Sequence, residues 1–267
     1  MNKTDNFFVI HNYNYVPLEI LEYPNNYIVF DASTNLEIRK ELEKYGIKFR
    51  AIANTGHNLS TYFTFFYENY NHLPDVMCLT KGHMIGRHCS KEYFDRVYNN
   101  RFFTFLYEDK NVKLKSGINS LVDESMYLEI NNSWYVNSPN HPHRYFDNYN
   151  RLLKFVYQDP IIPEYCLFAP GGCYIVTKEQ VYLHSDCFYK NLNKIMTYGL
   201  IPSFPSEAHQ IERMLPIFFT SKKRVNSWMD DEMMFEEMIK KEEMITKEND
   251  EKNKTKKNII ERIVSKL

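Results

Sequence analysis

Residues 54–88 gather side chains suited to holding an anion. The stretch has the sequence NTGHNLSTYFTFFYENYNHLPDVMCLTKGHMIGRH and contains three of the eight glycines of the chain. The candidate anion-binding side chains in its predicted loops are His57, Asn58, Lys81, His83, Arg87 and His88. Cations and hydrogen-bond donors beside glycines at helix N-termini are typical of phosphate-binding sites. The stretch therefore predicts contact with a phosphate-bearing ligand.

The elements around this stretch predict an α/β fold. Four short apolar runs, expected to be buried strands, lie at residues 6–10, 27–30, 49–53 and 76–80. Helical spacing of apolar residues follows at 35–45 and at 58–69, where the rings of an aromatic face are expected to form core. Strands that alternate with helices through short connections favour a mixed, mostly parallel sheet flanked by helices.

In such a sheet, ligands bind at the carboxyl ends of the strands, where the loops meet. The residues that follow the four predicted strands are His11, Asn12 and Asn14; Asp31 and Ser33; Asn54, His57 and Asn58; and Lys81, His83, Arg87 and His88. Together they suit a ligand with phosphates and hydroxyls, with the cations facing the anion and the Asn and Asp side chains facing ribose and base edges. A single histidine after a strand is more often a hydrogen-bonded structural residue, and it is the agreement of four loops that favours a ligand site.

Several standard catalytic motifs are absent from the sequence. It contains neither GxGxxG nor GxxxxGK[ST], and neither GxSxG nor HExxH. A metal site formed by Asp31, His83 and His88 is conceivable, but its spacing matches no standard pattern.

A second group of candidate residues lies in PSEAHQIER, at 205–213, which is expected to begin a helix at Ser206. Glu207, in the first turn, could deprotonate an acceptor hydroxyl, or it could simply cap the helix. His209 and Glu212 follow on the same helix, and Glu212 is expected to pair with Arg213 or to face solvent.

The composition narrows the class of protein. A chain of 267 residues with 43% hydrophobic content can bury one substantial core. A formal net charge of -1 argues against nucleic acid as a partner. The five cysteines lack CxxC spacing, which favours a reducing cytoplasm over a zinc site or a disulfide framework. The N-terminus lacks the apolar segment of a secretory signal, and no apolar run is long enough for a membrane span.

The character of the chain changes after residue 220. Residues 221–267 contain no glycine or proline and alternate short blocks of acids and lysines. We expect an α/β domain at 1–220 and a charged helical tail at 221–267. Three roles stay open for the tail: a solvated extension, a surface for a partner or a second subunit, or docking of the terminal KKNIIERIVSKL at a membrane surface.

Four blocks of the chain resemble a group of proteins from bacterial and viral polysaccharide gene clusters that look like relatives of GT-A-fold glycosyltransferases. The blocks are NTGHNLSTYFTFFYENYNHLPD, TKGHMIGRHCSKEYF, FAPGGCYIVTKEQV and PSEAHQIERML. The resemblance covers residues 6–220. It implies a nucleotide-binding N-terminal half, a central strand that ends at the donor phosphates, and an acceptor side lined by Gly171, Gly172 and Tyr174. It also implies that Glu207 is the base of an inverting displacement, with His209 beside it.

The chain departs from that family at the end of the central strand. GT-A enzymes usually carry an Asp-x-Asp there, which holds a divalent cation on the diphosphate, whereas this chain has Thr80-Lys81-Gly82-His83. Either cations replace the metal, or Mn²⁺ or Mg²⁺ has other ligands, or transfer activity is lost.

The resemblance and the residues together predict a glycosyltransferase of surface or capsular polysaccharide synthesis. It would move a sugar from a nucleoside-diphosphate sugar to a glycan or lipid-linked acceptor, in the cytoplasm or peripherally at the inner face of the membrane. The alternative is a non-catalytic nucleotide- or carbohydrate-binding or assembly protein, whose tail recruits a partner or a second copy.

Overall fold

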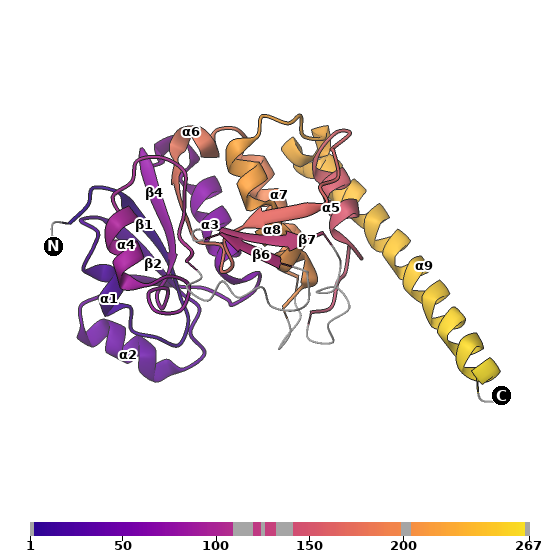
Figure 1. Cartoon of the computed structure of the whole chain (residues 1–267), viewed down its shortest axis with the longest axis horizontal. Coiled ribbons are helices and arrows are strands. Elements are labelled where there is room, and N and C mark those ends of the chain that lie inside the picture. Colours follow the sequence, from indigo (N-terminus) through magenta and orange to yellow (C-terminus); the bar gives the residue numbers. More distant parts are fainter. Residues whose placement is uncertain (1–2, 109–119, 124–125, 132–140, 199–203, 265–267) are drawn as a thin grey trace.

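The computed structural model describes residues 3–108, 120–123, 126–131, 141–198 and 204–264 (Figure 1). Its main sheet has the strand order β3-β2-β1-β4-β9-β5. The strands are β1 (Phe7–Asn12), β2 (Tyr27–Asp31), β3 (Phe49–Ala51), β4 (Val76–Lys81), β5 (Thr104–Phe105) and β9 (Tyr174–Thr177). The first four pair in parallel, and β9 runs antiparallel to both β4 and β5. The prediction of a mixed, mostly parallel sheet is confirmed.

The parallel strands are joined by short helical crossovers. These are α1 (Leu18–Leu21), α2 (Leu36–Lys44) and α3 (His57–Glu68), followed by the 3-10 turn η1 (Tyr70–His72). Strand β4 is apolar on both faces, with Met77, Cys78 and Leu79 fully buried, which explains its position inside the sheet. In the register of β1 and β4, His11 lies opposite Lys81, so the ends of these two strands bring both side chains to one edge of the sheet.

Helix α3 contributes a group of buried aromatic rings to the core beside the sheet. Tyr62, Phe63 and Phe66 are fully buried, and α3 packs against α7 (Asp186–Met196) and β1. Phe66 meets Tyr189 of α7 in an edge-to-face pair with ring centroids 5.1 Å apart. The expectation that these rings form core is confirmed.

A smaller antiparallel sheet lies beside the main one, in the order β6-β7-β8. Its strands are β6 (Ser120–Asp123), β7 (Met126–Ile130) and β8 (Tyr165–Phe168). The Pro-Gly-Gly turn after β8 leads directly into β9, yet β8 pairs with β7 whereas β9 pairs with β4. This turn therefore connects the two sheets instead of forming a hairpin.

The remaining helices surround the two sheets. They are α4 (Lys91–Val97), α5 (Tyr149–Val156), α6 (Lys178–Val181), α8 (Ser206–Thr220) and α9 (Glu232–Val264), with the 3-10 turn η2 (Ser227–Asp230) before α9. Helix α8 packs against the small sheet through β8 and also against α5, α6 and α7. It therefore links the small sheet to the rest of the body.

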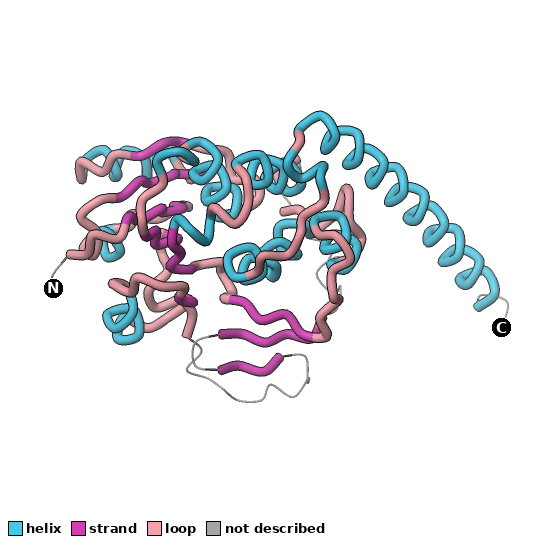
Figure 2. Tube along the Cα trace, turned by 90° about the horizontal axis from the view of Figure 1, so that it is seen from above, coloured by secondary structure: helices cyan, strands magenta, loops and turns pink. Residues whose placement is uncertain are grey.

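The predicted helical tail is present, and its first half packs against the α/β core. Helix α9 runs away from the sheets as a long rod (Figures 1 and 2). Phe235 and Ile239 are buried against the core, and the Thr246 hydroxyl donates to the Tyr145 carbonyl at 2.6 Å. Residues 251–258 are exposed throughout. Packing thus extends well past the expected boundary at residue 220.

Within the described ranges, no helix combines the length and the apolar character that crossing a bilayer requires.

Candidate functional site

A small cavity of about 120 Å³ lies at the carboxyl end of β4. It is lined by His57, Asn58, Leu59, Lys81, His88, Gly171, Ala208, His209 and Glu212. These residues come from the first turn of α3, the end of β4, the loop after β4, the turn between the two sheets, and α8. The structure thus brings together segments that are far apart in sequence, at the edge of the sheet where an α/β fold is expected to bind its ligand.

Three positive-φ positions shape the wall of the cavity. Gly56 and His57 have φ values of 68° and 55° where α3 begins, and the left-handed region is uncommon for a residue such as His57. Gly171 has a φ of 95°, and a Cβ atom there would lie 2.6 Å from Cε1 of His88. The Asn58 side-chain amide donates to the Gly171 carbonyl at 2.9 Å, which fixes the start of α3 to the turn. Glycine at 171 therefore lets the backbone pack directly against the His88 ring.

The Lys81 side chain brings a positive charge to the cavity. Its side chain is half-buried, and its ammonium makes no hydrogen bond or ion pair with any residue that the structure describes. Its charge also lowers the pKa of His11, His57 and His88, which shows that its field reaches these rings. An unpaired cation in a partly desolvated cavity is a strong attractor for an anion.

Three imidazoles in the cavity wall are kept neutral. Burial lowers the pKa of His57 to about 2, and of His88 and His209 to about 3, with neighbouring positive charge as a further cause. The Nε2 atoms of all three rings are buried without a hydrogen-bond partner among the described residues. Buried polar atoms are rarely left unpaired in native structures, so this cluster requires an explanation.

Glu212 places a carboxylate in the same cavity. Its Oε1 accepts the Gly171 backbone N–H at 2.8 Å, and its Oε2 lies 3.6 Å from Nη1 of Arg213. The expected pairing of Glu212 with Arg213 is therefore confirmed. The Arg213 guanidinium, however, is bound more closely by Glu129, with Nε 2.5 Å from its Oε2, so Glu212 is not fully neutralised by it.

The sequence contains a signal for Glu212 in its spacing from His209. His209 and Glu212 are three residues apart, and Ala208 and Glu212 are four apart, so all three lie on one face of α8. Because these residues share a face, a cavity that reaches His209 also reaches Ala208 and Glu212.

The polar residues at the ends of β1 and β2 form a separate cluster that is hydrogen-bonded within itself. Asp31 is fully buried and accepts the Asn12 amide at 2.9 Å, the Ser33 hydroxyl at 2.6 Å and Nε of Arg39 at 2.9 Å. His11 has its Nδ1 2.9 Å from the Thr61 hydroxyl, and burial lowers its pKa to about 3. These groups hold the strand ends together and do not line the cavity.

Four other predicted ligand residues lie at the strand ends but outside the cavity wall. Asn14 is tied to the Ser33 hydroxyl through its backbone N–H at 2.8 Å. His83 is exposed and stacks on Tyr15, with ring centroids 4.4 Å apart. Arg87 is exposed and Asn54 half-buried.

The conceivable metal site of Asp31, His83 and His88 is not assembled. The Asp31 carboxylate is paired with Arg39, and the His83 ring stacks on Tyr15. In the described part of the chain, no three His, Cys, Asp or Glu side chains converge in a way that would hold a metal.

The expected role of Glu207 as a base does not agree with its position. The side chain is fully buried, and Oε1 accepts the backbone N–H groups of Arg144 and Tyr145, both at 2.8 Å. Oε1 also accepts the N–H of Phe146 at 3.3 Å, and Oε2 accepts the Tyr198 hydroxyl at 2.8 Å. Burial raises the pKa of Glu207. With four donors on its carboxylate and no place in the cavity wall, Glu207 fixes the loop at 144–146 instead of facing a substrate.

Of the predicted acceptor-side residues, one lines the cavity and two do not. Gly171 lines the cavity, whereas Gly172 packs beside it: a Cβ there would lie 2.9 Å from Cδ2 of Leu59. Tyr174 is fully buried and stacks on Phe103 with ring centroids 5.5 Å apart, and its hydroxyl accepts the Ala169 N–H at 2.7 Å. Tyr174 is a core residue because the side chains of β9 alternate between two buried faces.

Comparison with known families shows which family the chain belongs to. Residues 39–233 match the model of a family described as protein of unknown function (DUF3431), and the chain belongs to that family. The matched segment includes every residue that lines the cavity and leaves out β1 and β2. No curated protein and no solved structure matches the chain.

Proposed function

We propose that this member of the DUF3431 family transfers a sugar from a nucleoside-diphosphate sugar to a hydroxyl of a glycan or lipid-linked acceptor. The observation that carries the proposal is the Lys81 ammonium, which pairs with none of the described residues, in a cavity that Glu212 also lines. Transfer from a diphosphate needs a cation for the departing charge and a base for the attacking hydroxyl. The cavity offers one of each.

The arrangement of strands gives further support. A parallel run β3-β2-β1-β4, followed by the reversed β9 and accompanied by a small second sheet, agrees with a GT-A-like arrangement. In that arrangement the end of the strand corresponding to β4 receives the donor diphosphate, and here that end is Lys81.

The size of the cavity indicates which part of the donor it receives. A volume of about 120 Å³ is well below the roughly 300–1,000 Å³ typical of a site that encloses a whole small ligand. We therefore place only a phosphate and the adjoining part of the sugar inside the cavity. The nucleoside would lie outside, over the exposed side chains at the strand ends, among them Asn14, His83 and Arg87.

The proposed reaction is a single displacement. Oε2 of Glu212 takes the proton of the acceptor hydroxyl while the hydroxyl oxygen bonds to the anomeric carbon. The bond from that carbon to the phosphate oxygen breaks, and the nucleoside diphosphate leaves with the electron pair and its charge beside Lys81. Attack from the face opposite the leaving group inverts the anomeric configuration. Neutral His57, His88 and His209 would donate hydrogen bonds after small ring rotations.

In this proposal Lys81 supplies the charge that Mn²⁺ or Mg²⁺ supplies where an Asp-x-Asp is present. Asp31, the buried acid nearest the strand ends, is already bound by Arg39. We therefore expect sugar transfer to persist in EDTA. Loss of transfer in EDTA, with recovery on adding Mn²⁺, would assign the charge to a metal with other ligands.

Nucleotide binding is tested by thermal denaturation with a panel of nucleoside diphosphates and their sugar conjugates at about 1 mM. A ligand at 100 times its Kd stabilises the folded state by about 2.7 kcal/mol, which raises the Tm of a chain this size by about 5–10 °C. We expect Lys81→Met to abolish this shift. Lys222→Met, at an exposed cation outside the cavity, is the matched control and should leave it intact. Absence of a shift with every ligand would refute the proposal.

Catalysis is tested by release of nucleoside diphosphate in the presence of candidate acceptors. Glu212→Gln keeps an acceptor for the Gly171 N–H but removes the base, so turnover should fall by roughly 10²- to 10⁴-fold while the thermal shift is retained. Glu207→Gln should keep turnover close to that of the wild type, because Glu207 does not line the cavity.

A second candidate is a non-catalytic nucleotide- or carbohydrate-binding or assembly protein. The observation that favours it is the exposed end of α9, from residue 251, which projects from the body where a partner or a second copy could bind (Figure 2). It predicts a thermal shift with nucleotide, no turnover with any acceptor, and loss of partner binding when the chain ends at Asp250.

We place this reaction in the cytoplasm, as part of surface polysaccharide synthesis, with attachment to the inner face of the membrane left open. All five cysteines are free, and four of them are buried, which suits a reducing compartment.

A further inference from the structure

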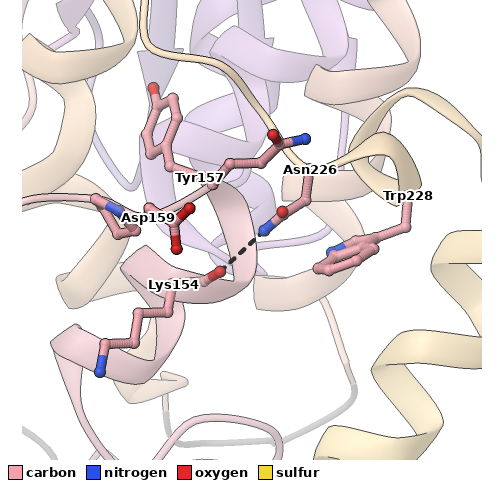
Figure 3. A pocket seen from close by; sticks show the side chains of 7 residues that line it. Lys154, Tyr157, Asp159, Asn226 and Trp228 are labelled. Carbon is pink, nitrogen blue, oxygen red and sulfur yellow. Dashed lines mark hydrogen bonds between the residues drawn. The ribbon is translucent and has the colours of Figure 1, made fainter.

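A second, larger pocket lies at the C-terminal end of α5, away from the cavity at β4 (Figure 3). Its volume is about 630 Å³, and it shares no lining residue with the cavity. Its wall includes Trp228 and the polar side chains of Lys154, Gln158, Asp159 and Asn226. We propose that this pocket binds a carbohydrate chain, with one sugar ring stacked on Trp228 and its hydroxyls hydrogen-bonded to Asp159 and Lys154.

The aromatic wall of the pocket is held in place by the fold. Nε1 of Trp228 donates to the Phe155 carbonyl at 2.9 Å, so the orientation of the indole is fixed. The Asn226 amide donates to the carbonyls of Lys154 and Phe155, both at 2.9 Å, and ties the segment before η2 to the end of α5. A rigid aromatic surface loses little conformational freedom on binding, which favours its use as a contact platform.

The polar wall offers hydrogen-bonding groups that the fold does not use. The side chains of Lys154 and Asp159 are exposed and make no hydrogen bond or ion pair with any described residue. Asp159 has a φ of 44°, a conformation that non-glycine residues seldom adopt and that often marks a functional position. Figure 3 shows the hydrogen bond from Asn226 to Lys154 between Asp159 on one side and Trp228 on the other.

This combination matches the surface of a sugar ring. One face of a pyranose consists of C–H groups that pack on an aromatic ring, and its rim carries hydroxyls. A carboxylate accepts two neighbouring hydroxyls, while an ammonium donates to hydroxyl and ring oxygens. The pocket volume lies within the roughly 300–1,000 Å³ of small-ligand sites, which leaves room for one or two rings of a longer chain.

Single-stranded nucleic acid is the main competitor, because a base also stacks on Trp and residues 222–224 carry three exposed cations close by in the sequence. The Asp159 carboxylate argues against it, since it would oppose a phosphate backbone entering the pocket. The formal net charge of -1 also gives no general attraction for a polyanion. The observations therefore favour carbohydrate.

The proposal does not depend on transferase activity. If the chain is a transferase, this pocket would hold a glycan at a distance from the reacting cavity.

The test uses the full chain and calorimetric titration with four linear hexasaccharides, of maltose, cellulose, chitin and mannan type, and with poly(U). We expect at least one hexasaccharide to bind with a Kd below about 5 mM. Asp159→Asn retains a residue type that tolerates positive φ, and we expect it to weaken binding roughly 5-fold or more. Trp228→Phe should weaken it to a similar extent. Both variants are first checked for a cooperative unfolding transition, with a small loss of Tm expected for Trp228→Phe because it lacks the hydrogen bond to the Phe155 carbonyl.

Two control variants separate this site from other sites and ligands. Lys81→Met should leave hexasaccharide affinity unchanged, so failure of the proposed transferase function and failure of this site are distinguishable. Lys223→Gln alters a cation outside the pocket lining, and it should also leave hexasaccharide affinity unchanged.

An independent readout is tryptophan fluorescence. The chain has two tryptophans, and Trp134→Phe leaves Trp228 as the sole reporter of binding. A bound sugar should change the Trp228 emission. Binding of no hexasaccharide, or binding that neither Asp159→Asn nor Trp228→Phe weakens, overturns the proposal. Preferential binding of poly(U), weakened by Lys223→Gln, overturns it in favour of nucleic acid.

Discussion

Glu207→Ala should destabilise the fold, and the size of the effect follows from the hydrogen bonds of the carboxylate. The substitution removes the acceptor of three backbone N–H groups and of the Tyr198 hydroxyl. The N–H groups of Tyr145 and Phe146 are buried, and each buried donor left without a partner costs about 1–3 kcal/mol. Water entering the space left by the side chain will satisfy part of this deficit. We therefore expect a loss of about 3–4 kcal/mol.

Such a loss is a large share of the roughly 5–15 kcal/mol by which native domains are stable. It is measured by urea denaturation followed by circular dichroism. With a slope of about 3 kcal/mol per molar urea, the midpoint should fall by about 1 M.

Glu207→Gln is the matched variant. Its amide oxygen can still accept the backbone N–H groups, and the Tyr198 hydroxyl can turn to accept from the amide nitrogen, so the loss should stay below about 1.5 kcal/mol. A loss below about 1 kcal/mol for Glu207→Ala would refute a structural role. So would a Glu207→Gln variant that folds normally but has no turnover, because it would restore Glu207 as the base.

Two further predictions concern pH and the tail. Burial holds the pKa of His57, His88 and His209 at about 2–3, below the ordinary 6.5, so the unfolded chain binds more protons in acid. The free energy of unfolding should therefore fall between pH 7 and pH 5, by up to about 2 kcal/mol for each ring, and urea midpoints that rise in acid would contradict this. A chain ending at Asp250 should keep its Tm within about 2 °C, because residues 251–258 are exposed. A chain ending at Asp231 loses the buried part of α9 and should be destabilised by at least about 3 kcal/mol; equal Tm values for the two truncations would contradict the packing of α9.

The strands and helices of this chain could be predicted because their signals are local. The apolar run at 76–80 is too short for a helix and is apolar on both faces, which fits only a strand inside a sheet; it became β4. The alternation of strands with helices made the parallel half of the sheet predictable as well.

Strand partners could not be predicted in the same way. The runs on either side of the Pro-Gly-Gly turn are both apolar, and nothing in either run specifies its neighbour. In the structure β8 joins the small sheet and β9 joins the main one. An apolar pattern specifies that a strand is buried, whereas its partner depends on which other edge is free.

The sequence by itself determined which residues could meet an anion: cations and glycines after β4, and a polar start to α3. Six predicted site residues line one cavity, namely His57, Asn58, Lys81, His88, Gly171 and His209. The sequence did not determine which acidic residue of α8 faces that cavity. Glu207 and Glu212 are five residues apart on one helix, and such a spacing turns a side chain well away from its predecessor. Only the packing of α8 beneath the loop at 144–146 decided that Glu207 binds backbone and that Glu212 lines the cavity together with Lys81.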